Sequence, residues 1–333
     1  MSLKHKFTLQ KQGTLKKYPG GSRLLSSLTH SMALGLIELE KGGFREPHWH
    51  PNAQELTYCL EGRVLITLFS PQNLRSTFTL SAGEVVFFPQ GYLHHLENIF
   101  EGKSKLILAY NHPSPEDLDL SSTIRCMTAH TLGKTFGSSE KVFQDLQDSS
   151  KNSFISQRKT LANPEFSSIA NPHKFSLESI TAQIQTKAGN ARIASFASFP
   201  ILENLALFSL RLYPKAIREP HWHPNATELN YVLQGQALLT ILSPDGTIDT
   251  FELQEGDGSI IPAGYLHYIE NIGPEELHMA IYFNHNSPSD IGLSGAFSAY
   301  SPEVLCSLFS VDLELIHQIH SFLEDRMIVT GGG

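Results

Sequence analysis

The sequence predicts an all-β protein of two tandem barrels, each followed by short α-helices. The stretch REPHWHPNAQELTY at residues 45–58 returns at residues 218–231 as REPHWHPNATELNY, with two differences in fourteen positions. Between turn residues, the apolar runs are short and rich in β-branched and aromatic side chains, which is typical of a sandwich or barrel. Near the end of each half, apolar residues recur at three- and four-residue intervals, which indicates helices.

The repeat extends well beyond these stretches and defines the domains. A spacing of 173 residues also separates Gly62 from Gly235 and Asn111 from Asn284. An upstream segment, residues 5–9 (HKFTL), reappears as residues 173–177 (HKFSL), so each copy is expected to begin there. Such a long period indicates a duplicated domain. We therefore expect an N-terminal domain at residues 1–160 and a C-terminal domain at residues 161–333, joined by a polar linker near residues 150–170.

Individual elements follow from local pattern. Strands are expected where β-branched and aromatic residues run between Gly, Pro, Asn or Ser. A serine that can cap a helix precedes helical spacing near the end of each copy. The strands predicted in the first copy are Val64–Phe69, Thr77–Leu80, Val85–Phe88 and Lys105–Tyr110, and the predicted helices are Ser138–Asp148 and Ser310–Asp325.

Composition excludes several classes of function. The chain has 333 residues, 41% of them hydrophobic, and a net charge of −8 without a basic run, which argues against nucleic-acid or anionic-membrane binding. No apolar run approaches the roughly 20 residues of a membrane span. The N-terminus shows no apolar signal segment, so a cytoplasmic location is expected. Three widely spaced cysteines, Cys59, Cys126 and Cys306, argue against a disulfide framework and are expected to be buried thiols.

Histidines and a glutamate are spaced for metal binding. Residues two apart on a strand face the same way, so His48 and His50 present both imidazoles to one side. Pro51 interrupts the strand's hydrogen bonding, so the Glu55 carboxylate can point back toward these histidines. A turn at residues 89–91 leads into another strand, which places His94 near the same point. The second copy repeats the set as His221, His223, Glu228 and His267. Three imidazoles and a carboxylate suit Mn, Fe, Zn, Ni or Cu, and an octahedral shell would leave two positions for substrate or O₂.

These residues form two motifs that resemble those of the cupin superfamily. The first has Gly, five residues, His-x-His, four residues, Glu, six residues and Gly; the second has Gly, five residues, Pro-x-Gly, two residues, His, three residues and Asn. The first copy matches them with Gly42, His48, His50, Glu55, Gly62, Gly83, Pro89, Gly91, His94 and Asn98. The second copy departs only at the leading glycine, since Lys215 stands 173 residues after Gly42. The duplicated form resembles the bicupin oxalate decarboxylases, which implies two jelly-roll barrels, each with one metal ion, manganese first.

The resemblance also implies roles for three further residues. Arg45 and Arg218, three residues before the first histidine of each set, match an arginine that pairs with the substrate carboxylate. On an ideal strand this odd offset points away from the metal, but Pro47 and Pro220 can disturb the pleat, so sequence leaves the direction open. The family's lid carries a Ser-Glu-Asn-Ser stretch, which this chain lacks. Glu116 stands at the spacing of the family's catalytic acid and is the predicted proton carrier.

Three functions remain open from sequence. The first is a manganese enzyme acting on oxalate or a similar small carboxylate, by decarboxylation or oxidation, with germin-like superoxide dismutation as a variant. In the second copy, the position where some relatives place another carboxylate holds Ile281, which argues against full acid/base equipment there. The second function is non-enzymatic metal or ligand binding, as in storage and spherulin-type cupins. The third is other cupin chemistry, such as dioxygenation or sugar-acid isomerisation. The resemblance further implies a homo-oligomer, a trimer or hexamer.

Overall fold

Short strands with one buried face build the molecule. The structure is a computed structural model that describes residues 5–9, 14–27, 31–149, 154–159 and 171–330. In strand β7 (Arg63–Ser70), Val64, Ile66 and Leu68 are buried, whereas Phe69 is exposed. These three side chains point to one face, which packs in the core, and Leu65 on the opposite face is buried as well.

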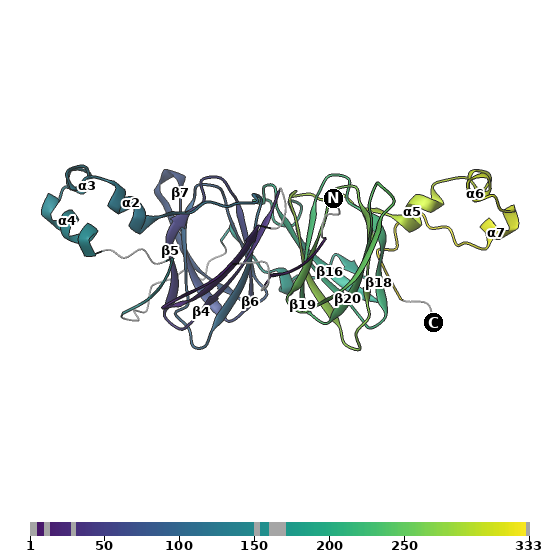
Figure 1. Cartoon of the computed structure of the whole chain (residues 1–333), viewed down its shortest axis with the longest axis horizontal. Coiled ribbons are helices and arrows are strands. Elements are labelled where there is room, and N and C mark those ends of the chain that lie inside the picture. The colour runs from purple at the N-terminus through teal and green to yellow at the C-terminus, as the bar shows by residue number, and fades with distance from the viewer. Residues whose placement is uncertain (1–4, 10–13, 28–30, 150–153, 160–170, 331–333) are drawn as a thin grey trace. The chain divides into compact units, whose positions relative to one another are not determined.

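The chain divides into two compact units with the same architecture. We call residues 12–176 the first unit, and residues 1–11 together with 177–333 the second unit. Each contains a six-stranded and a seven-stranded antiparallel sheet that face each other (Figure 1). The predicted all-β fold with two barrels is therefore confirmed.

In the first unit the sheet orders are β12-β5-β10-β7-β8, with β13 beside β5, and β14-β9-β6-β11-β4-β3-β2. Apart from β7, its strands are β2 (Thr14–Tyr18), β3 (Gly21–Ser27), β4 (Ala33–Leu39), β5 (Gly43–Trp49), β6 (Glu55–Glu61), β8 (Leu74–Ser81), β9 (Val85–Phe88), β10 (Leu93–Glu97), β11 (Ser104–Tyr110), β12 (Leu118–Asp119), β13 (Ile155–Gln157) and β14 (Lys174–Phe175). All four strands predicted in this copy are present.

In the second unit the orders are β21-β20-β23-β18-β25, with β26 beside β18, and β1-β22-β19-β24-β17-β16-β15. The strands are β1 (Lys6–Thr8), β15 (Ile184–Gln185), β16 (Gly189–Ala194), β17 (Ala206–Leu212), β18 (Ala216–Trp222), β19 (Glu228–Gln234), β20 (Gln236–Leu242), β21 (Ile248–Gln254), β22 (Asp257–Ile261), β23 (Leu266–Asn271), β24 (Leu277–Phe283), β25 (Ile291–Gly292) and β26 (Ile328–Thr330).

The entry strands are exchanged between the two halves of the sequence. Strand β1 pairs with β22 and strand β14 pairs with β9. His5 donates from Nδ1 to the carbonyl of Ile260 at 2.9 Å, and His173 makes the same bond to Phe87 at 3.0 Å. Because the two entry segments are almost identical, sequence alone cannot tell which barrel each one joins. The contact-based division therefore differs from the predicted boundary at residues 160/161. Most of the predicted linker, residues 150–153 and 160–170, lies outside the described residues.

Helices lie between strands β12 and β13 in the first unit and between β25 and β26 in the second. They are α2 (Leu120–Cys126), α3 (Ala129–Phe136), α4 (Glu140–Ser149), α5 (Leu293–Ser298), α6 (Pro302–Phe309) and α7 (Leu313–His317). Helix α4 confirms the helix predicted at residues 138–148. The helix predicted at residues 310–325 is wrong, since Ser310 has a φ of 57° and ends α6 instead of starting a helix. Only the five-residue α7 forms within that range.

The cysteine prediction holds in part. Cys59 is buried, whereas Cys126 is exposed and Cys306 is half-buried, and all three are free thiols. Cys126 is therefore not the buried thiol expected from sequence. Among the described residues, no helix is both long and apolar enough to cross a membrane.

Candidate metal centres

A bulge in one strand of each unit sets the direction of the arginine and the first histidine. His48 on β5 lies opposite His94 on β10, while Arg45 lies opposite Leu96, so three steps along β5 match two along β10. The extra residue cancels the odd offset and turns both side chains to the same face. The second unit has the same bulge, with His221 opposite His267 and Arg218 opposite Ile269. Arg45 and Arg218 therefore both point inward, as the resemblance implied.

The four predicted ligands of each unit lie together inside its barrel. The histidines come from the six-stranded sheet and the glutamate from the facing sheet. The two sets are His48, His50, Glu55 and His94, and His221, His223, Glu228 and His267; within each, ligand atoms lie within 4.8 Å of one another and all four residues are buried. The strands thus bring together residues that are up to 46 positions apart (94 − 48; 267 − 221).

Backbone carbonyls orient every imidazole of both sets. In the first unit, Nδ1 of His48 donates to the carbonyl of Glu46 at 2.8 Å. The corresponding bonds of the other five rings run from His50 to Glu116 at 3.0 Å, His94 to Tyr92 at 2.9 Å, His221 to Glu219 at 2.7 Å, His223 to Ser289 at 2.7 Å and His267 to Tyr265 at 3.0 Å. With Nδ1 occupied, each ring offers Nε2 to the centre, as metal-binding histidines commonly do.

The donor set fits a divalent metal. Nε2 of His94 is buried and has no hydrogen-bond partner among the described residues; the Glu55 carboxylate oxygen lies 3.8 Å from it. Such an unpaired buried nitrogen is costly unless a ligand satisfies it. The second carboxylate oxygen of Glu55 accepts a hydrogen bond of 2.5 Å from the hydroxyl of Thr57. In the second unit, Asn230 donates to Glu228 at 2.7 Å in the same way.

In the first unit, His48 and Glu55 are already in the protonation states that bind metal, whereas His50 is not. Burial, and then the charge of Arg45, holds the pKa of His48 well below its usual range, so this imidazole is neutral. Burial alone would raise the pKa of Glu55, but the hydrogen bond from His50 and the nearby His94 imidazole hold it well below its ordinary value. Burial would lower the pKa of His50, but its hydrogen bonds to Asp117 and Glu55 raise it to about 9. Metal binds neutral imidazoles and ionised carboxylates, so a bound ion would displace a proton from His50.

Arg45 is enclosed by acidic and aromatic side chains. It is 1% exposed, and its Nη1 donates to Asp119 at 2.6 Å while its Nη2 lies 3.2 Å from Asp117. Its guanidinium lies 3.5 Å from the centre of the Phe154 ring, a cation–π contact. Glu46, the next residue along β5, accepts a hydrogen bond from the backbone of Ser121.

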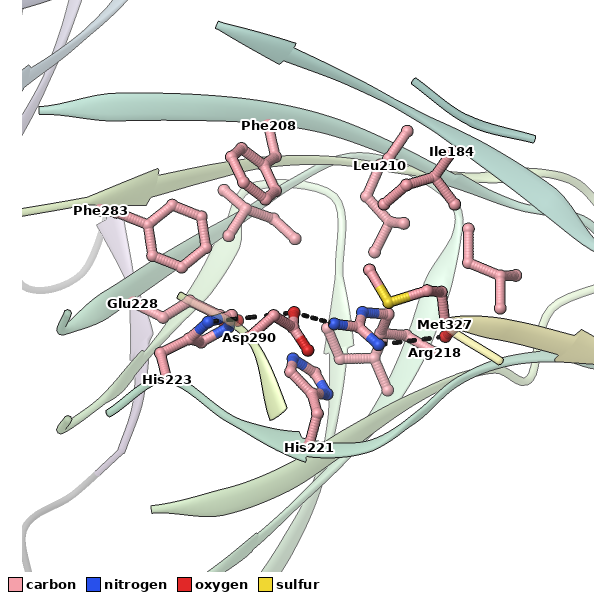
Figure 2. A pocket seen from close by; sticks show the side chains of 14 residues that line it. Ile184, Phe208, Leu210, Arg218, His221, His223, Glu228, Phe283, Asp290 and Met327 are labelled. Carbon is pink, nitrogen blue, oxygen red and sulfur yellow. Dashed lines mark hydrogen bonds and ion pairs between the residues drawn. The ribbon is translucent and has the colours of Figure 1, made fainter. Parts of the chain in front are cut away.

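Arg218 lines a cavity together with metal ligands. The cavity measures about 30 Å³, and Figure 2 shows Arg218 and Asp290 beside His221 and His223 in it. Arg218 pairs with Asp290 and donates to the carbonyl of Met327 at 3.1 Å. Ile281 also lines this cavity, so the position expected to lack a carboxylate does present an apolar side chain. The cavity of the second unit is thus lined both by metal ligands and by an arginine that can bind an anion.

The predicted proton carrier, Glu116, is not beside the metal ligands in this conformation. Its side chain is exposed, and only its backbone carbonyl reaches His50. The neighbouring Asp117 faces the site instead, with one carboxylate oxygen 3.2 Å from Nδ1 of His50. Sequence reasoning missed Asp117, although the repeat carried a signal. Asp117 matches Asp290 at the spacing of 173, whereas Glu116 matches Ser289.

Comparisons with known proteins agree with this architecture. The family model described as Cupin matches residues 22–143 and 175–317. An oxalate decarboxylase of Bacillus subtilis is 26% identical to this chain, in an alignment that covers 80% of this chain and 71% of the relative. An oxalate decarboxylase of Arthroderma benhamiae is 26% identical over 96% of this chain and 82% of its own length. Germin-like protein 5-1 of Oryza sativa is 34% identical over 33% of this chain and 47% of its own length.

The fold is also that of solved structures. A structure of Bacillus subtilis oxalate decarboxylase, an enzyme with Mn(II) centres, superposes with a TM-score of 0.88 at 21% identity, covering 99% of this chain and 89% of that one. A structure of the same enzyme at pH 4.6 gives the same score over all of this chain. At this identity the likeness establishes the fold alone.

Proposed function

The chain belongs to the cupin family, and on this premise we propose that it is a manganese-dependent enzyme that acts on oxalate or a similar small carboxylate. The reaction is decarboxylation to formate and CO₂, or oxidation by O₂ to CO₂ and hydrogen peroxide. One observation carries the proposal: in each unit, three histidines and a glutamate meet inside the barrel, together with a buried arginine. The relatives that span most of the chain are oxalate decarboxylases, which supports the choice of substrate.

Each unit would hold one manganese ion through its four ligands. The same donor types suit Fe, Zn, Ni and Cu, and manganese is proposed because it is the metal of the structurally similar decarboxylase. When bound, manganese supplies a Lewis acid and a redox partner for the carboxylate and O₂. The protein itself supplies orientation, charge and exclusion of water.

The arginines would bind the substrate carboxylate. A guanidinium offers two parallel N–H donors to a carboxylate, which fixes both its position and its orientation. Arg45 and Arg218 are 1% and 7% exposed, so their charge acts in a poorly hydrated space and attracts an anion strongly. In decarboxylation of hydrogen oxalate, the C–C bond breaks, CO₂ leaves, and the proton of the carboxyl group is returned to the carbon that becomes formate.

The proton carrier would come from the segment after β11. Glu116 remains the proposed carrier on the family spacing, and its role requires the segment to move so that its exposed side chain turns inward. Asp117 is the alternative, since it already contacts His50 and Arg45. Burial of its half-buried carboxylate would raise the pKa of Asp117, but His50 and then Arg45 lower it to about 2, so Asp117 faces the site as an anion.

Product analysis tests the proposal. The full chain is loaded with manganese, its metal content is measured, and formate, CO₂ and peroxide are followed after oxalate is added. Formate indicates a working proton carrier, and peroxide indicates oxidation. If neither formate nor peroxide forms, the proposal is contradicted, and the non-enzymatic and superoxide dismutase alternatives are favoured.

Three variants then separate the roles. Glu116→Gln or Asp117→Asn is expected to convert formate production into peroxide production if that residue moves the proton, with a loss of about 10²–10⁴-fold in formate. Arg45→Lys keeps the charge but loses the planar two-donor geometry, so it is expected to raise the KM for oxalate about tenfold or more while leaving the product ratio unchanged. The trimeric or hexameric assembly and the cytoplasmic location stay predictions.

A further inference from the structure

We propose that Arg23 determines substrate specificity in the first unit: with Arg45 it forms a two-arginine site for one carboxylate of a small dicarboxylate. In this structure the carboxylate of Asp117 fills that site. The inference rests on the proposed function and deepens it, since it assigns recognition of a doubly charged substrate to a residue outside the metal-binding motifs.

The contacts of Asp117 outline the site. One of its oxygens lies 3.2 Å from Nη2 of Arg45, and the other lies 3.3 Å from Nη1 of Arg23. The side chains of Arg23 and Asp117 are 14% and 17% exposed, so the pairs are largely shielded from solvent. A carboxylate held by one guanidinium at each oxygen is the arrangement expected of a dedicated anion site, and Asp117 stands in for a substrate carboxylate.

An aromatic ring fixes both guanidiniums in place. Arg23 and Arg45 lie 4.2 Å and 3.5 Å from the centre of the Phe154 ring. Tyr18 stacks on the same ring at 5.5 Å. Because cation–π contacts restrict both side chains, little conformational entropy remains to be lost when an anion binds between them.

The charge balance indicates what happens when Asp117 leaves. The cluster holds the two guanidiniums, Asp117, and Asp119, which bonds Arg45 at 2.6 Å. If Asp117 moves out with its segment, Arg45 keeps Asp119 and the influence of Glu46, whereas Arg23 loses the carboxylate with which it pairs. A largely shielded guanidinium without an ion-pair partner is costly, so the site would take up another anion. Since Asp117 also contacts His50, that anion binds next to the metal-ligand set.

The second unit lacks the additional arginine. Arg23 on β3 pairs with Ile37 on β4. The residue that matches Ile37 in the second unit is Leu210, and its partner on β16 is Ala191. Ala191 lines the cavity of Arg218. The same ladder position therefore carries a guanidinium in one unit and a methyl group in the other, so only the first unit offers two cations to one carboxylate.

Binding measurements on the manganese-loaded full chain test the inference. Arg23→Gln is expected to weaken oxalate and malonate about 10- to 100-fold, since a charge-assisted hydrogen bond is lost, and to change acetate less than about twofold. Arg63→Gln is the matched control, because Arg63 is exposed and stacks on Phe100. Equal losses for acetate and oxalate, or no loss for either dicarboxylate, would overturn the inference.

A second variant tests the same site with the opposite sign. Asp117→Ala removes the resident carboxylate and is expected to tighten dicarboxylate binding by at least about threefold. If Arg23→Gln does not fold, this variant decides, and unchanged or weaker binding contradicts the inference. Loss of malonate affinity in Arg23→Gln without any oxalate turnover by the parent would uphold the site and refute the proposed reaction. If the parent turns oxalate over and Arg23→Gln keeps both turnover and affinity, the proposed reaction would be upheld and the two-arginine site refuted.

Discussion

The two units hold the same metal ligands but surround them differently. In the first, Arg45 contacts Asp117, Asp119 and the Phe154 ring. At the spacing of 173, Asp119 and Phe154 are replaced in the second unit by Gly292 and Met327. The carbonyl of Met327 bonds Arg218, and a separate carboxylate, Asp325, fills the space at Gly292. A metal ion demands its donors in both units, whereas the surroundings that recognise substrate have diverged.

The comparison suggests a division of labour. Two arginines converge on one carboxylate in the first unit, whereas Arg218 alone faces Asp290 in the second. If the metal centres are equivalent and the anion sites are not, removing a metal ligand from either unit should lower the metal content by the same amount. The two changes should lower turnover by different amounts.

The largest expected effect comes from removing one ligand in each unit. His94→Ala and His267→Ala should each halve the manganese content, from two ions per chain to one. Turnover of oxalate should fall about 100-fold or more in His94→Ala, because a metal ligand is lost beside the two-arginine site. His267→Ala should retain at least about half of it, since that site lies in the other unit. Elemental analysis and formate production measure both quantities. Equal loss of turnover in the two variants would break the comparison.

A smaller effect is expected from the residues that hold the ligand carboxylates. Thr57→Ala and Asn230→Ala each remove the hydrogen bond to the second oxygen of Glu55 or Glu228. Each should weaken manganese binding in its own unit about 10- to 100-fold, as loss of such a partner commonly does. Competition with a chelator measures this affinity. Thr57→Asn, which copies the second unit, should restore it, and failure of that exchange would indicate that the two centres are not equivalent.

The smallest expected effect is the contribution of His278 to the dependence of stability on pH, which the first unit lacks at the matching position. Burial, and then Arg211, lowers the pKa of His278 from 6.5 to about 4. The fold therefore favours the neutral imidazole, so stability is full above pH 6.5 and is lost as the pH falls towards 4. Between pH 7 and about pH 5.5 the free energy of unfolding should fall by about 1 kcal/mol. Glu178 opposes the shift, and the adjacent Arg192 adds to it.

Thermal unfolding of the full chain at both pH values checks this prediction. His278→Gln should remove that part of the loss. The matching position of the first unit holds Lys105 instead of a histidine, so Lys105→Gln serves as the control. An unchanged pH dependence in His278→Gln would show that the destabilisation arises elsewhere.

The sequence predicted the metal ligands because they are nearly all within one repeated stretch. His48, His50 and Glu55 belong to the fourteen residues that recur almost unchanged, and His94 follows a turn that also recurs. The inward direction of Arg45 could not be predicted, since it depends on a bulge that only the pairing of β5 with β10 reveals. Odd or even spacing along a strand does not give the direction of a side chain wherever a bulge adds an extra residue.

Other features lay outside the reach of sequence reasoning. Arg23 is on β3, where the copies have drifted and the counterpart, Ala191, lies 168 residues away (191 − 23), not 173. Only the hydrogen-bonding ladder aligns the two. Ser310 matches the pattern of a helix cap, but its left-handed conformation ends a helix, and a residue's type does not fix this choice.

The exchange of entry strands links the far ends of the chain. Strand β1 is the edge strand of its sheet and pairs with β22, which begins about 250 positions later in the sequence (257 − 8). A truncation that removed the first eleven residues would therefore leave β22 as an unpaired edge strand. Unpaired edges recruit other chains. Trimming the amino terminus, a routine step in preparing a protein for crystallisation, would therefore promote aggregation through the opposite half of the polypeptide.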